Sequence, residues 1–363
     1  MSKYQVTIET VKDVLPIENA DRIELVKLAD KDYQLVVQKN QFTIGSKIVY
    51  IPVDGIVPDK MLEQLGLTGR LAGGAKNRVK TIKLKGMPSQ GLGFKPGQVE
   101  GSEGFDLLEP GTDVTEILGI TKYDPEDQLQ NPAGYKVRVI TNPLPEFVKY
   151  YDIEGAQNHK YIVEKLMDVE VDITEKMEGS HFVASLDTNG EFTLCSRQRN
   201  LVDKENGDGV RHDWFAVAEK YDLKNKMNNH LNWLHDEFNS FRLTVRGEVC
   251  GPKWQGNYYG LKELELFIFE VEIDGEPIPA GAVYSTVKEH IGLKHVPFLF
   301  RGYLRDFIGG SSLVERSHGQ SEVNKNKIRE GIVIRPTWKE MRDDKLGRVI
   351  IKQRDPIYLS NEK

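Results

Sequence analysis

The first 96 residues contain short runs in which apolar and polar side chains alternate. The clearest runs are Ile23–Leu28, Tyr33–Val37 and Lys47–Val53, and Gly45 provides a turn before the last of them. A period of two places successive side chains on opposite faces of a strand, so each run predicts a half-buried β-strand. Several short strands at close intervals predict a small β-barrel, which we place in residues 1–120.

The pattern changes after residue 120. Residues 121–146 lose their periodicity and contain four prolines, which predicts a linker. Helical periodicity follows between Asp213 and Phe238, where seven apolar residues share one face and are expected in a core: Phe215, Ala218, Tyr221, Met227, Leu231, Leu234 and Phe238. We therefore expect residues 147–363 to form a second domain that contains helices.

Composition and charge restrict the function classes. The chain has 363 residues, of which 39% are hydrophobic and 29% charged, as in ordinary globular proteins. Its net charge of −6 means that contacts with nucleic acid would have to come from local basic patches. Cys195 and Cys250 form neither a disulfide framework nor a Cys-x-x-Cys pair, and no membrane-length apolar run or signal peptide is present. We expect a cytoplasmic protein without membrane association.

One local basic patch lies in residues 76–85, which carry five basic side chains and no acidic one. As a strand, this segment would place Lys76, Arg78 and Lys80 on one face, in a row suited to a phosphate backbone. A charged edge strand exposed to solvent is the alternative interpretation.

The segment Thr174–Ser180 contains the strongest chemical candidate, Lys176. An unprotonated lysine amine can attack phosphorus, and Gly179 completes a Lys-x-x-Gly motif. The same motif begins at Lys83, Lys204 and Lys253, so a larger pattern has to distinguish among them.

That larger pattern follows Lys176 in order: Ser196–Arg197, Arg246–Gly251, Leu266–Val271, Arg329–Pro336 and Val349–Arg354. Together with Lys176, these segments resemble motifs I, Ia, III, IIIa, IV and V of the covalent nucleotidyltransferases, which include polynucleotide ligases and mRNA capping enzymes. Upstream, Ile17–Ile23, Gly45–Pro52 and Ser89–Leu92 resemble the OB module that precedes the catalytic domain in one RNA ligase class. The resemblance implies an α+β chain with an N-terminal OB-type, nucleic-acid-binding β-barrel, followed by a nucleotidyltransferase domain of antiparallel sheets with flanking helices.

The resemblance also implies a role for each motif residue. Lys176 would be the nucleophile and Lys352 would contact the α-phosphate, while Arg354 stands where the family commonly has a second lysine. Phe269 would stack on adenine, with a core phenylalanine as the alternative.

Five further residues complete the site that the resemblance implies. Glu248 would bind the ribose, Arg197 would lie near ribose and phosphate, and the main chain around Glu175 would meet the adenine edge. Glu178 and Glu330 would hold Mg²⁺, with Mn²⁺ as a substitute, through bound waters.

The implied function is an ATP-dependent RNA ligase. It would join 3′-hydroxyl and 5′-phosphate RNA ends, including those of a nicked duplex, through a lysyl-AMP intermediate, in RNA repair or nick sealing and without an obligate protein partner. A GTP-dependent guanylyltransferase of the capping type is an alternative, although the chain ends soon after Lys352 and the C-terminal OB domain of those enzymes is not expected here. A non-catalytic OB-based RNA-binding protein is the second alternative.

Overall fold

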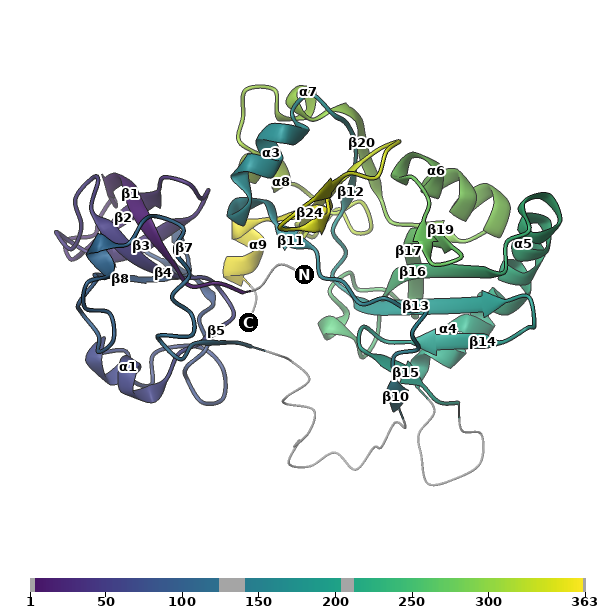
Figure 1. The fold of residues 1–363 in the computed structure, drawn as a ribbon, viewed down its shortest axis with the longest axis horizontal. Helices are drawn as coiled ribbons and strands as arrows, with labels where there is room; N and C mark the ends of the chain where they lie inside the picture. The colour runs from purple at the N-terminus through teal and green to yellow at the C-terminus, as the bar shows by residue number, and fades with distance from the viewer. Residues whose placement is uncertain (1–3, 124–140, 204–211, 362–363) are drawn as a thin grey trace. The chain divides into compact units, whose positions relative to one another are not determined.

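The computed structural model describes residues 4–123, 141–203 and 212–361, which form two compact units (Figure 1). The first unit contains residues 4–123, 155–163 and 355–361, and the second contains 141–154, 164–203 and 212–354. The predicted linker, residues 121–146, lies mostly outside the described residues. The predicted domain boundaries remain predictions, and we note that residues 355–361 group here with the first unit.

The first unit is built on a five-stranded antiparallel sheet with the order β3-β2-β1-β4-β8. Its strands are β1 (Thr7–Pro16), β2 (Ile23–Leu28), β3 (Gln34–Gln38), β4 (Lys47–Ile51) and β8 (Leu92–Phe94). Shorter elements are β5 (Gly55–Ile56), α1 (Asp59–Gln64), β6 (Thr81–Leu84), β7 (Met87–Gln90), η1 (Phe105–Leu107), β9 (Thr121–Lys122), η2 (Ala156–Asn158) and α9 (Pro356–Asn361).

Strand β1 allows this sheet to curl into a nearly closed barrel. It pairs with β4 through its first half and with β2 through its second, with a bulge between Val11 and Asp13. Hydrogen bonds from Gln34 and Val36 in β3 reach residues of β7, which brings the two ends of the barrel together. The predicted N-terminal OB-type barrel is therefore confirmed. Helix α9, from the C-terminus of the chain, packs on β6 and β7 of this unit.

The prediction of a continuous strand over residues 76–85 is wrong for its first half. Only Thr81–Leu84 is regular strand, and Lys76 has a left-handed φ of 57° within a turn. Arg78 pairs with Asp54 and lies 3.6 Å from the centroid of the Tyr123 ring. The predicted row of three equivalent cations does not form, because Lys76 lies in a turn and the Arg78 side chain is held by Asp54.

The second unit contains a large, mainly antiparallel sheet with the order β10-β15-β14-β13-β16-β17-β18, in which β19 pairs with β17 in parallel. Its strands are β10 (Thr141–Pro143), β13 (Ser180–Asp187), β14 (Phe192–Cys195), β15 (Arg199–Leu201), β16 (Arg242–Cys250), β17 (Glu265–Ile273), β18 (Glu276–Pro277) and β19 (Lys294–His295). Helices near this sheet are α4 (Asp213–Lys220), α5 (Leu223–Phe238), η3 (Gln255–Asn257), α6 (Ala280–Ser285) and η4 (Thr286–Ile291).

A second sheet has the order β11-β24-β21-β12-β20. Its strands are β11 (Glu154–Gly155), β12 (Glu170–Glu175), β20 (Phe298–Tyr303), β21 (Gly331–Pro336) and β24 (Ile351–Arg354). The remaining elements are α3 (Lys160–Leu166), α7 (Leu304–Ile308), α8 (Leu313–Ser317), β22 (Arg342–Asp343) and β23 (Gly347–Arg348). The α+β class and the antiparallel sheets with flanking helices are confirmed.

The helical segment predicted over 213–238 is divided into α4 and α5. Asp222 has a left-handed φ of 50°, which ends the first helix and redirects the chain. Met227, Leu231 and Leu234 on α5 join the core against β13 and β16 as predicted (Figure 1). Phe238 is 65% exposed, so its assignment to the core is wrong. Within the described ranges, no helix has both the length and the apolar character needed to cross a bilayer.

Candidate active site

Lys176, Glu330 and Arg354 meet at one end of the second sheet. Lys176 directly follows β12, Glu330 directly precedes β21, and Arg354 ends β24; β21 pairs with both other strands. Lys176 Nζ lies 2.7 Å and Arg354 Nε 3.0 Å from the same oxygen, Oε1 of Glu330. Gly331 allows β21 and β24 to lie close together beside these residues, because a Cβ atom there would lie 2.2 Å from the carbonyl oxygen of Gln353.

The electrostatics of Glu330 reflect these neighbours. Burial opposes ionisation of its carboxyl group, but the positive charges of Lys176 and Arg354 outweigh burial and hold the pKa of Glu330 below its usual value. Glu330 is therefore a buried carboxylate that fixes two cations at the end of the sheet.

Lys352 belongs to the same group of cations. Burial, together with the positive charges of Lys176, Arg354 and Arg197, lowers the pKa of Lys352 to about 8, and the negative charge of Asp152 opposes the shift. Arg197, in the turn between β14 and β15, lies 2.6 Å from Asp152 through its Nη2 atom. The structure thus brings together the four predicted cations of the site, a concentration of positive charge suited to a polyphosphate.

Glu178 and Glu248 lie where the loop that contains Lys176 passes strand β16. A Cβ atom on Gly179 would approach Cys250 Sγ to 2.8 Å and Glu248 Cβ to 3.2 Å, so the glycine allows the loop to run against β16. Burial raises the pKa of the Cys250 thiol, and the negative charges of Glu248, Glu178, Glu175 and Glu330 raise it further. The predicted carboxylates therefore gather around one buried thiol.

These carboxylates fit a divalent ion that keeps its water ligands. Glu330 Oε2 and Glu248 Oε2 are buried acceptors with no hydrogen-bond partner. Over the ranges that the structure describes, no three His, Cys, Asp or Glu side chains form a protein-only cage. A carboxylate with an unused oxygen suits Mg²⁺, which binds few protein ligands and retains water.

Phe269 occupies a bulge in β17. Arg246 of β16 pairs with Glu270, whereas Gly247 pairs with Ile268, so Phe269 has no opposite residue. A Cβ atom on Gly247 would lie 2.5 Å from the carbonyl oxygen of Phe267, which explains the glycine beside the bulge. The half-buried Phe269 ring lies 5.7 Å from the ring of His181.

The remaining predicted residues are Glu175 and the basic residues Lys76, Arg78 and Lys80. The side chain of Glu175 is buried and accepts a hydrogen bond of 2.7 Å from the main chain of Glu322, and its own N–H donates to Pro297. Lys76, Arg78 and Lys80 belong to the first unit and are not part of this cluster.

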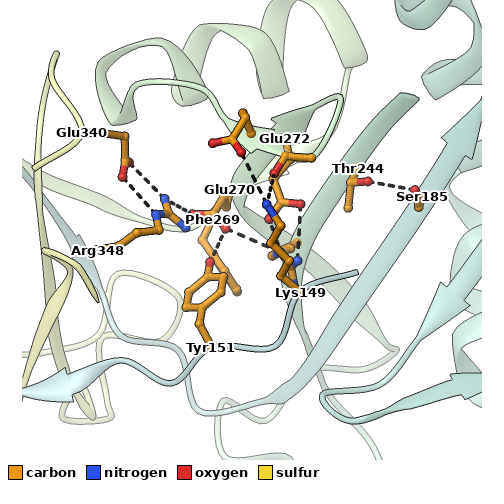
Figure 2. A network of polar contacts seen from close by, with 12 residues as sticks. Lys149, Tyr151, Ser185, Thr244, Phe269, Glu270, Glu272, Glu340 and Arg348 are labelled. Carbon is orange, nitrogen blue, oxygen red and sulfur yellow. Dashed lines mark hydrogen bonds and ion pairs between the residues drawn. The ribbon is translucent and has the colours of Figure 1, made fainter. Parts of the chain in front are cut away.

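The sequence analysis did not identify a buried network of charges behind Phe269 (Figure 2). Glu270 accepts a hydrogen bond from Tyr151 and pairs with Arg348 at 2.9 Å and Arg335 at 3.5 Å. Arg335 also donates to the carbonyl oxygen of Phe269 at 2.8 Å. Burial opposes ionisation of Glu270, but Arg335 and Arg348 outweigh it and keep its pKa low.

Part of this network has a signal in the sequence. Glu272 stands between Val271 and Ile273, and its buried ion-pair partner at 2.6 Å is Arg246, two residues before the motif residue Glu248. Charged residues within apolar runs predict buried partners, although they do not identify them.

Comparison with known protein families decides the assignment. A model of the RNA ligase family matches residues 169–354, more than half of the chain. This chain belongs to the RNA ligase family. An OB-fold domain model matches residues 5–96. The predicted family and enzyme class are confirmed, whereas no curated protein matches the chain.

Solved structures of this family share the whole fold. An apo mutant of the Naegleria gruberi RNA ligase is 24% identical, with a TM-score of 0.75 over 99% of this chain and 98% of its own. Mutants of the same enzyme with AMP and Mn and with ATP and Mn have TM-scores of 0.76 and 0.75 at 23% and 24% identity, each covering 99% of both chains. At this identity, the similarity shows the fold.

Proposed function

We propose that this member of the RNA ligase family uses ATP and a divalent metal to join the 3′-hydroxyl and 5′-phosphate ends of RNA through a lysyl-AMP intermediate on Lys176, in nick sealing or RNA repair. The observation that carries the proposal is the convergence of Lys176, Glu330 and Arg354, with Lys352 in the same group of cations. Naegleria ligase structures contain ATP or AMP together with Mn, which supports both cofactors.

In the first step, the Lys176 amine attacks the α-phosphorus of ATP. A nitrogen–phosphorus bond forms, the bond to the β-phosphate oxygen breaks, and pyrophosphate leaves. Lys352, Arg354 and Arg197 would neutralise charge that develops on the phosphate oxygens.

The protein also has groups to position the nucleotide and the metal. Phe269 would stack on the base and the unpaired Oε2 of Glu248 would accept from a ribose hydroxyl. Glu330 and Glu178 would hold the divalent ion, which supplies further neutralisation of phosphate charge when bound.

In the second step, AMP passes from Lys176 to the 5′-phosphate of an RNA end. In the third, the 3′-hydroxyl of the other end attacks that phosphate, a new phosphodiester forms, and AMP leaves. Magnesium-dependent labelling with α-labelled ATP, followed by a denaturing gel, tests the first step. Label from GTP instead of ATP would support a guanylyltransferase, and no label from either would support a non-catalytic RNA-binding protein.

A further inference from the structure

Strand β20 lies at an open edge of the second sheet and carries an unusual set of exposed rings. Phe298 and Tyr303 on the strand are 37% and 46% exposed, and Tyr284 and Trp338 beside it are 38% and 57% exposed. We call these four residues the β20 aromatic surface. Exposed aromatic groups of this size commonly mark an interaction site.

Cations lie between and beside these rings. The Arg301 guanidinium carbon lies 5.5 Å from the centroid of Phe298 and 5.1 Å from that of Trp338. Two hydrogen bonds of 2.7 Å to Asp172 hold Arg301 in place. Lys288 donates to the Tyr284 hydroxyl at 2.8 Å, and the Tyr284 and Phe298 rings are 6.1 Å apart. Arg301 thus lies between the Phe298 and Trp338 rings, and Tyr303, whose ring centroid lies 4.9 Å from the Arg305 guanidinium carbon, follows on the same strand.

The surface begins close to the nucleophile and extends away from it. Phe298 pairs with Thr174, two residues before Lys176, whereas Tyr303 pairs with Glu170 at the other end of β12. Four residues of strand span about 13 Å, roughly the rise of four stacked nucleotides. An RNA strand lying along β20 would thus lead toward Lys176, the proposed nucleophile.

An open cavity of about 540 Å³ lies at Trp338 and is also lined by Lys339 and Arg342. Glu170 and Glu340 line it as well, but Glu340 is held by Arg348 at 3.0 Å. Lysine and arginine beside a large exposed ring can contact a base and its phosphate together.

We infer that the β20 aromatic surface binds the single-stranded part of the RNA substrate, with bases stacked on Trp338, Tyr303 and Phe298. The inference rests on the proposed function. A polynucleotide fits better than a peptide because the rings alternate with cations. Since the chain's net charge of −6 gives no general attraction for RNA, local surfaces of this kind have to supply it.

The test compares Trp338→Ala and Tyr303→Ala, singly and together, with Trp233→Ala as a matched control. Trp233 is a 47% exposed tryptophan on α5, and its ring lies beside those of His230, Phe238 and His290. Three measurements are made on each full-length protein: self-labelling with α-labelled ATP, sealing of nicked RNA with single-stranded extensions, and anisotropy of a short fluorescent single-stranded RNA. Circular dichroism melting confirms folding.

We expect both single variants to label normally, to bind the short RNA at least fivefold more weakly, and to need correspondingly more RNA for half-maximal sealing. Trp338→Phe should recover most of the binding, because a smaller ring still stacks, and Trp233→Ala should match the natural protein. Unchanged RNA binding and sealing in the folded double variant would overturn the inference. Failure of the natural protein to label or seal would instead overturn the proposed function.

Discussion

The Nζ atom of Lys176 lies 2.7 Å from Oε1 of Glu330, so the proposed nucleophile is positioned by a carboxylate from a different strand. The two residues are 154 positions apart in the sequence, and strand pairing between β12 and β21 brings them together. This pair gives the protein a defined location for the first chemical step, and the predictions below begin from it.

Lys176→Ala should abolish transfer of label from ATP to the protein, because it removes the amine that lies beside Glu330. Lys83→Ala and Lys253→Ala, which alter two of the other three Lys-x-x-Gly motifs, are the controls and should label like the natural protein. Mass spectrometry of the labelled peptide locates the AMP. Adenylylation at Lys83 or Lys253 would refute the assignment of Lys176.

Glu330→Gln should reduce adenylylation strongly while leaving the fold intact. The amide retains the size of the side chain but loses the charge that holds Lys176 and Arg354. Removing a partner from such a site commonly costs on the order of 10² to 10³ in rate. A magnesium titration should restore only part of the activity, and a rate equal to that of the natural protein at low magnesium would exclude Glu330 from the metal site.

Lys352→Met should stabilise the protein while it suppresses adenylylation. The pKa of Lys352 falls from 10.5 to about 8 in the folded protein, so at pH 7 the folded state carries a charge that its surroundings disfavour. Replacing that charge should raise the free energy of unfolding by about 1 to 3 kcal/mol.

The pH dependence of this gain has a definite sign. Between pH 8 and 10.5, the unfolded state binds more protons at Lys352 than the folded state, so the natural protein gains stability from this residue as pH rises. The advantage of Lys352→Met should therefore shrink through this window. Urea unfolding of both proteins at pH 7 and pH 9.5 measures it, and an advantage that grows with pH would contradict the assignment.

Phe269→Leu should raise the ATP concentration needed for half-maximal labelling more than it lowers the maximal rate. Stacking on adenine acts on the ground state and the transition state alike, so its loss weakens binding. Phe267→Leu, at a buried neighbouring position, is the matched control for packing effects. An unchanged ATP requirement would return Phe269 to a purely structural role.

The three predicted RNA-binding residues of the first unit, Lys76, Arg78 and Lys80, should separate into two classes. Lys76→Ala with Lys80→Ala should impair sealing of nicked RNA more than self-labelling, and the defect should increase with salt if these lysines contact phosphates. Arg78→Ala should lower the melting temperature, because Arg78 is held by Asp54 and Tyr123. Normal sealing by the double lysine variant at every salt concentration would remove these residues from the RNA interface.

Local sequence patterns encode the order of the motifs and the type of many elements. In the alternating run Tyr33–Val37, the side chains of Tyr33, Leu35 and Val37 are buried and those between them are less so, which is the pattern of a half-buried strand. Gly179 is visible along the chain as part of the motif at Lys176. The reason for this glycine, and for Gly247 and Gly331, lies in the fold, because an added Cβ atom at each would clash with a neighbouring strand.

Only the tertiary structure decided which distant residues share one site and how their charges balance. The bulge at Phe269 depends on the pairing of two strands, and no periodicity in β17 alone predicts it. Tyr151, Arg335 and Arg348 converge on Glu270 from three separate segments, because a buried carboxylate requires partners wherever the fold can bring them. The segment 76–80 likewise begins in a turn at Lys76 and contains no regular strand, although its sequence favoured one, since the ion pair of Arg78 with Asp54 and its contact with Tyr123 exist only in the folded barrel.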